Sequence, residues 1–178
     1  MLKNNGYNIK VINLIDMDQS DCYNPFSYIR EETDVIKLIT NLIANTTPKG
    51  ANPADPFWEK VSADYFSGLA LALFEDAKED EININSINLM STVGEDKFGG
   101  STYIKEYFNS KDPTSAASIN VSATITAPNE TKGSILSVFR QKVKLFASRE
   151  NLSEMLSYSD INLETIGERP TAVFIVIQ

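Results

Sequence analysis

The sequence has 178 residues, of which 42% are hydrophobic, and its formal net charge is −8. Its length and composition fit one folded domain and argue against intrinsic disorder. The excess of acids disfavours tight binding to phosphate backbones, which depends on cationic side chains. The sequence contains no histidine, which excludes serine–histidine and cysteine–histidine catalytic sites and the ordinary zinc sites of histidine and cysteine.

Cys22 is the only cysteine of the sequence, so it has no partner for a disulfide within the chain. A single cysteine suits a reducing compartment, and we expect a structural thiol rather than a nucleophile. We recognise neither a signal peptide nor a transmembrane span in the sequence.

The two ends of the sequence both predict β-strands. Residues 7–15 alternate and are rich in β-branched side chains. Residues 171–178 form a nearly continuous apolar run, which is typical of a strand buried on both faces. These features favour two neighbouring strands of a larger parallel sheet, with a helical body between them. A small two-stranded ribbon packed on the helical domain is the alternative.

Two segments are predicted before the longest apolar helix. Asn24-Pro25 is a turn signal at the end of a polar loop. Residues 32–44 carry their apolar side chains on one face and predict an amphipathic helix, capped by Thr33 or Asp34. Residues 45–54 then combine several turn formers and predict a long loop.

The central helix is predicted to begin at Pro56, with Asp55 as its cap. The segment YFSGLALALF that follows is apolar nearly all round, so other helices must cover it. We expect Trp58 to be a core anchor rather than a stacking platform. The predicted core residues on this helix are Phe57, Trp58, Val61, Tyr65, Leu69 and Leu73.

Acidic residues concentrate in the middle of the sequence. A short helix is predicted over residues 85–93 with Asn85 as its cap, and residues 94–101 are expected to be a flexible connector without the lysine of a phosphate-binding loop. The acids form either a solvated face or a contact surface for a basic partner. The candidate contact residues are Glu75, Asp76, Glu79, Asp80, Glu81, Glu95 and Asp96.

Residues 103–156 predict four helical segments. Residues 103–108 form one, and Asp112-Pro113 is expected to start the next, which runs to about Thr126. A basic amphipathic helix follows Pro128, and a short helical turn is expected within residues 151–156. The basic helix either complements its own dipole or offers a face to DNA or an acidic partner. Its candidate residues are Lys132, Arg140, Lys142, Lys144 and Arg149.

Catalysis by this chain alone would depend on carboxylates. Glu59 and Asp64 could pair as general acid and base in a cleft. Without histidine, a metal-binding cluster or a phosphate loop, we expect no catalytic residues, no bound metal and no cofactor, and therefore no enzymatic activity in this chain.

The motifs Asn24-Pro25-Phe26 and Asp55-Pro56-Phe57-Trp58, together with the segments TKGSILSVFRQKVKLFAS and LSYSDINLETIGERPTAVFIVI, resemble the TraG/TraD-like type IV coupling proteins of conjugative DNA transfer. The similarity covers essentially the whole chain and looks closest to the branch found in conjugative elements of Gram-positive bacteria. In that family the full protein is a membrane-anchored, hexameric ATPase that uses ATP and Mg²⁺. An all-α domain is inserted into its RecA-like motor domain.

The resemblance implies a mainly α fold of about six to seven helices with short flanking strands. Residues 1–16 and 169–178 would be strands left from the motor domain, and residues 17–168 the all-α domain. The implied function is recognition of the relaxase, the relaxosome or accessory transfer proteins on the cytoplasmic side of the membrane. Direct contact with DNA, or a purely structural role in the motor, is the alternative. We expect the isolated domain to be a monomer.

Overall fold

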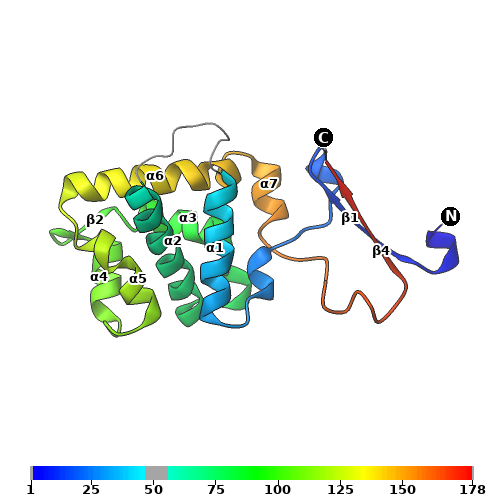
Figure 1. Ribbon diagram of the computed structural model, residues 1–178, viewed down its shortest axis with the longest axis horizontal. Coiled ribbons are helices and arrows are strands. Elements are labelled where there is room, and N and C mark those ends of the chain that lie inside the picture. The colour runs from blue at the N-terminus through cyan, green and yellow to red at the C-terminus, as the bar shows by residue number, and fades with distance from the viewer. Residues whose placement is uncertain (1, 47–55, 178) are drawn as a thin grey trace.

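The computed structural model describes residues 2–46 and 56–177, and over these residues the predicted mainly helical fold is confirmed. Figure 1 shows a helical body with a two-stranded ribbon beside it. The helices and strands of the described residues are β1 (Asn8–Asn13), α1 (Glu32–Thr46), α2 (Pro56–Asp76), α3 (Ile84–Val93), β2 (Lys97–Phe98), β3 (Ser101–Thr102), α4 (Tyr103–Ser110), α5 (Ala116–Ile125), α6 (Asn129–Ala147), α7 (Glu150–Met155) and β4 (Thr171–Val176).

The terminal strands β1 and β4 pair in parallel, which confirms that they are neighbours. The register runs from Asn8 opposite Thr171 to Asn13 opposite Val176. Parallel strands are usually covered on both faces, yet Ile175 is 65% exposed here. The ribbon lies beside the helices rather than on them (Figure 1). Part of the apolar surface of β4 is therefore exposed, whereas β1 is partly buried throughout.

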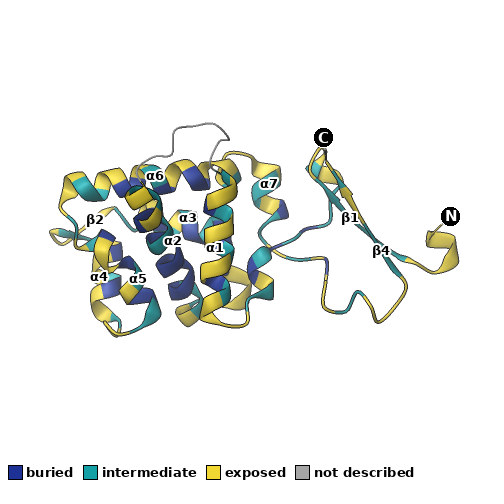
Figure 2. Cartoon of the chain, viewed as in Figure 1, coloured by how far each residue is buried: buried dark blue, intermediate teal, exposed yellow. Residues whose placement is uncertain are grey.

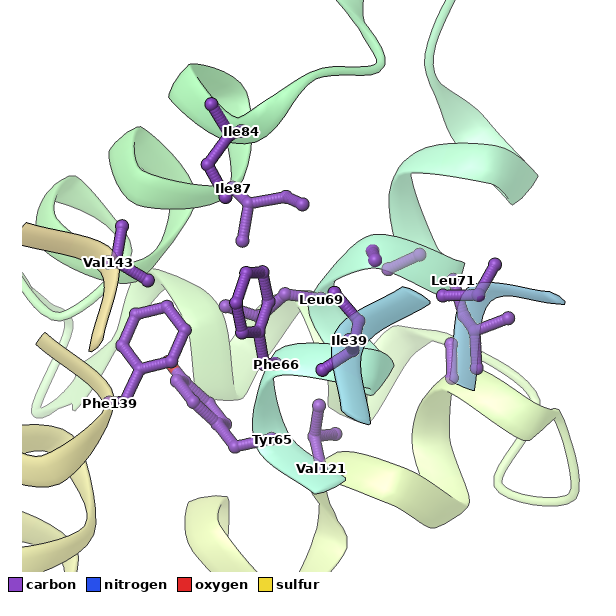
Figure 3. Close-up of a cluster of buried hydrophobic side chains, with 14 of the residues drawn as sticks. Ile39, Tyr65, Phe66, Leu69, Leu71, Ile84, Ile87, Val121, Phe139 and Val143 are labelled. Carbon is purple, nitrogen blue, oxygen red and sulfur yellow. The ribbon is translucent and has the colours of Figure 1, made fainter. Parts of the chain in front are cut away.

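Helix α2 is the centre of the helical body, as the sequence predicts. Helices α1, α3, α5 and α6 all pack against it. Phe139 of α6 meets Tyr65 and Phe66 edge-on, with ring centroids 5.3 and 5.2 Å apart, in the core shown in Figure 3. Helix α5 approaches most closely at Gly68, where an added Cβ would lie 2.4 Å from Cγ1 of Val121. Dense contact around α2 therefore holds the other helices in place.

The predicted core residues of α2 are correct only after its first turn. Val61, Tyr65 and Leu69 are buried, and Leu73 is partly buried against the same cluster. Phe57 is wrong as a core residue because its side chain is 53% exposed. Trp58 is only partly buried and contacts Phe57 edge-on. The unbroken buried run of α2 is residues 65–72, and Figure 2 shows this helix exposed at its start and buried further along. Asp55, the predicted cap, lies outside the described residues.

Two helix starts differ from the predictions because another side chain caps the helix. Asn83, not Asn85, caps α3, since its Oδ1 accepts hydrogen bonds from two backbone N–H groups of the first turn at 3.0 Å. Ser115, not Asp112, caps α5. Asp112 instead accepts from the Thr114 N–H at 2.8 Å and closes a turn before the helix begins.

Smaller elements complete the helical body. Asn24 caps a 3-10 helix at Pro25–Tyr28, where the turn signal was predicted. The side chain of Asn24 is buried and also donates to the Ile82 carbonyl at 2.8 Å. The predicted connector 94–101 overlaps the short antiparallel pair β2–β3, which ends at Thr102 and is turned by two glycines with φ of 55° and 91°. Residues 47–54 of the predicted long loop lie outside the described residues.

Candidate functional site

The predicted acidic residues lie at the two ends of α3. Glu75 and Asp76 are at the end of α2, and the 3-10 helix Glu79–Glu81 follows. Glu95 and Asp96 come directly after α3. Ten helical residues rise about 15 Å, so the two acidic groups are separated by roughly the length of α3. The structure therefore does not gather all seven carboxylates into one patch.

Glu75 and Asp76 hold α4 and the segment after it against α2. Asp76 Oδ2 accepts from the Tyr107 hydroxyl at 2.6 Å and from Lys111 Nζ at 2.8 Å. Glu75 lies 2.7 Å from the same ammonium group. The hydrogen bonds from Lys111 and Tyr107 lower the pKa of Asp76. Burial and the Asp76 carboxylate raise the pKa of Tyr107 to about 12. These two acids have a structural role, and Lys111 offsets part of their charge.

Glu79 and Asp80 are the carboxylates most available to a partner. Both residues are exposed, and among the described residues neither forms an ion pair. Glu81 is also exposed, and its Oε2 accepts from the Lys78 N–H at 2.9 Å, which fixes the 3-10 turn. Lys78 is the only basic residue directly beside these three acids in the sequence.

Glu95 points into the protein rather than toward a partner. Its Oε2 lies 2.7 Å from Lys132 Nζ of α6, and the two side chains are only 15% and 12% exposed. Burial, and then the Glu95 carboxylate, raises the pKa of the nearby Tyr65 hydroxyl. Asp96 is exposed. Of these two candidate acids, only Asp96 is therefore available for contact.

An apolar groove runs along the outer side of α3, and we call it the α3 groove. Its volume is about 450 Å³, and the end of α2, α3 and α4 form its walls. Leu89 and Val93 are 60% and 51% exposed along it, and Glu81 lines it as well. Its apolar and aromatic lining residues are Leu73, Ala77, Leu89, Met90, Val93, Tyr103, Ile104 and Tyr107.

The α3 groove is not among the sites predicted from the sequence, although the sequence contains a signal for it. Ile84 and Ile87 face the core, as Figure 3 shows. Leu89, Met90 and Val93 are spaced for a second apolar face of the same helix. A short helix with two apolar faces is expected to bury both of them. Only the tertiary structure shows which face is left uncovered by the rest of this chain.

The five predicted basic residues do not form one exposed face. Lys142 is buried and lies 3.3 Å from Glu59 of α2, and Lys132 pairs with Glu95. Arg140, Lys144 and Arg149 are exposed. Two of the five are therefore wrong as surface contacts, because α6 directs them toward acids of neighbouring segments.

The side chains of Glu59, Asp64 and Cys22 are not arranged for catalysis. Glu59 pairs with Lys142, and Asp64 lies five residues further along α2, on a different side of the helix. Burial raises the pKa of Asp64, but the helix does not bring the two carboxylates together. Cys22 is buried, and desolvation raises the pKa of its thiol, so little reactive thiolate forms.

The described residues contain no cluster of His, Cys, Asp or Glu that could hold a metal ion. None of the helices over the same residues is long and apolar enough to cross a bilayer.

The comparison with protein families gives one full-length match. Residues 1–178 match the model of the family described as type IV secretory system conjugative DNA transfer. The chain belongs to this family of conjugative DNA-transfer proteins, which confirms its resemblance to TraG/TraD-like coupling proteins. The comparison with curated proteins gives no match.

Proposed function

We propose that this chain is the substrate-recognition domain of a type IV coupling protein. It would bind the relaxase, the relaxosome or accessory transfer proteins before the DNA–protein substrate passes to the transfer channel. Membership of the family supports a role in conjugative DNA transfer. The observation that carries the binding role is the exposed acidic turn Glu79–Glu81. Such a turn favours a basic protein partner, because charge complementarity raises encounter rate and selectivity.

In this proposal the chain is part of a larger motor protein. Residues 17–168 would be the all-α domain, and residues 1–16 and 169–178 would belong to the motor domain. The exposed Phe174 and Ile175 of β4 support this, because parallel strands are usually covered on both sides. The parent protein would be a membrane-anchored hexamer that uses ATP and Mg²⁺, with this domain in the cytoplasm.

ATP hydrolysis is not part of the function proposed for this chain. The sequence has no GxxxxGKS/T motif to hold the phosphates of ATP. The purified chain should therefore release no phosphate from ATP above a blank containing Mg²⁺ and buffer. Release that depends on protein concentration would contradict this part of the proposal.

The experiment that tests recognition is a calorimetric titration of the purified chain with the relaxase encoded beside it. We expect binding that is lost or strongly weakened when Glu79→Lys and Asp80→Lys are combined. The matched control combines Glu150→Lys and Glu168→Lys, which changes the net charge equally at two other exposed positions. If the control weakens binding as much, net charge rather than this acidic turn explains the effect. A relaxase that binds only to the full motor would favour a purely structural role.

Direct DNA contact is the second candidate, and the exposed Arg140, Lys144 and Arg149 are the observation in its favour. Three cations against a net charge of −8 predict weak binding, since affinity grows with the number of phosphates neutralised. We expect no mobility shift of duplex or single-stranded DNA at low salt. A shift that disappears when all three are changed to Gln would establish this function instead.

A further inference from the structure

We infer that the α3 groove binds a short amphipathic helix with a basic polar face, contributed by a cargo protein. The inference rests on the proposed recognition function. It adds the place where the cargo binds and the chemical class of the segment that is bound.

The side chains that line the groove give it an apolar surface. Leu89 and Val93 are 60% and 51% exposed and lie on one side of α3. Met90 of α3 and Tyr107 of α4 line the same hollow. A soluble domain gains by covering such a patch, and contiguous exposed apolar surface marks interaction sites. The floor matches the apolar stripe of a partner helix of about three turns, since α3 itself spans about 15 Å.

The groove has its shape before a partner arrives. The Ile104 N–H donates to the Gly94 carbonyl at 2.7 Å, which joins α4 to the end of α3. Tyr107 is fixed by its hydrogen bond to Asp76 and by Lys111 Nζ, which lies 5.2 Å from the centre of its ring. Walls that are already ordered reduce the conformational entropy lost on binding.

Charge decides which kind of helix fits. Glu81 lines the groove, and Glu79 and Asp80 lie beside it in the same 3-10 turn, which follows Lys78. An amphipathic helix without Lys or Arg on its polar face would place no cation opposite these carboxylates. A helix with Lys or Arg on its polar face would place cations near that end of the groove. A second copy of this chain is a poor occupant on this ground, because its net charge is −8.

The test uses a fluorescein-labelled synthetic helix of about four turns, with Leu on one face and Lys on the other. Fluorescence anisotropy would measure its affinity for the full chain. We expect Leu89→Lys to weaken binding by about tenfold or more, as for an anchor residue at the centre of an interface. Ile119→Lys of α5 is the matched control, because Ile119 is 59% exposed and does not line the groove. It adds the same charge and should leave the affinity unchanged.

Three results would overturn the inference. The first is failure of the Leu–Lys peptide to bind the wild-type chain. The second is an equal loss of affinity in Leu89→Lys and Ile119→Lys, which would mean that the peptide senses only net charge. The third is a wild-type dimer, seen by sedimentation, that Leu89→Lys dissociates, because the groove would then bind a second copy.

The relaxase titration separates this inference from the proposed function. If the relaxase binds the wild-type, Leu89→Lys and Ile119→Lys chains equally, recognition stands and the groove is excluded as its site. If the relaxase binds none of them, the recognition function itself fails. Selective loss with Leu89→Lys supports both.

Discussion

Glu95 and Lys132 form an ion pair with each other, at 2.7 Å between Oε2 and Nζ. The sequence pattern predicts them on two different surfaces, one acidic and one basic. Both side chains are mostly buried, and the pair joins the end of α3 to α6. Their charges therefore act in the fold, and neither residue is free to meet a partner.

Removing one member of this pair should destabilise the protein without changing partner binding. Lys132→Met leaves the Glu95 carboxylate in a poorly solvated position, which should lower the free energy of unfolding by about 1–3 kcal/mol. Urea unfolding measures the loss. Lys144→Met, at an exposed position of the same helix, should change it by less than about 0.5 kcal/mol. Equal effects of the two substitutions would show that the ion pair has no special role.

Two glycines in helices should respond in opposite directions to alanine. A Cβ on Gly68 would lie 2.4 Å from Val121 Cγ1 and 2.9 Å from the Ala117 carbonyl oxygen. Gly68→Ala should therefore cost about 1–3 kcal/mol of stability through overpacking between α2 and α5.

Gly133 of α6 is the control for that substitution, because an added Cβ meets nothing within 4 Å. Gly133→Ala should raise stability by up to about 1 kcal/mol, since alanine is the better helix former. Val121→Ala should rescue Gly68→Ala only in part, because the contact with the Ala117 oxygen remains. Thermal unfolding of the three variants would decide whether this close approach sets the distance between the helices.

The aromatic core should depend on Phe139 more than on Trp58. Phe139 is fully buried against Tyr65 and Phe66, so Phe139→Ala should cost about 3–5 kcal/mol. Trp58 is partly buried in the first turn of α2, so Trp58→Ala should cost less. Urea unfolding of both variants checks the order. A larger loss of unfolding free energy for Trp58→Ala than for Phe139→Ala would show that Trp58 is a core residue after all.

The hydrogen bond between Tyr107 and Asp76 should make stability sensitive to alkaline pH. The pKa of Tyr107 is raised from 10.0 to about 12 in the folded protein. The unfolded chain therefore loses this proton first, so the contribution of Tyr107 is complete below pH 10 and is lost as pH rises toward 12. Tyr107→Phe should remove about 1 kcal/mol or less at neutral pH, and the stability of the variant should fall less steeply above pH 10.

Urea unfolding at neutral pH and across pH 10 to 12 measures both effects. Tyr103→Phe, at an exposed position of the same helix, is the control and should follow the wild-type profile. A Tyr107→Phe profile parallel to that of the wild type would show that the hydroxyl does not contribute.

The sequence alone determined the helical body, the start of α2 at Pro56, the terminal strands and the family. Apolar periodicity, an apolar run at each end of the chain and proline at a first helical position act locally, so they can be read from neighbouring residues. Local signals gave the wrong cap for α3 and α5, because each helix has two possible capping residues near its start. Asn83 and Ser115 are the caps because their side chains accept hydrogen bonds from the free N–H groups of the first turn.

Only the tertiary structure decided which charges and which apolar faces remain exposed. Glu95 and Lys132 are 37 positions apart in the numbering, and nothing in their local sequence indicates that they meet. The groove along α3 has the same origin: Leu89 and Val93 look like core residues until the packing of α2 and α4 leaves their face uncovered. Availability to a partner depends on contacts between distant segments, and local sequence patterns do not contain them.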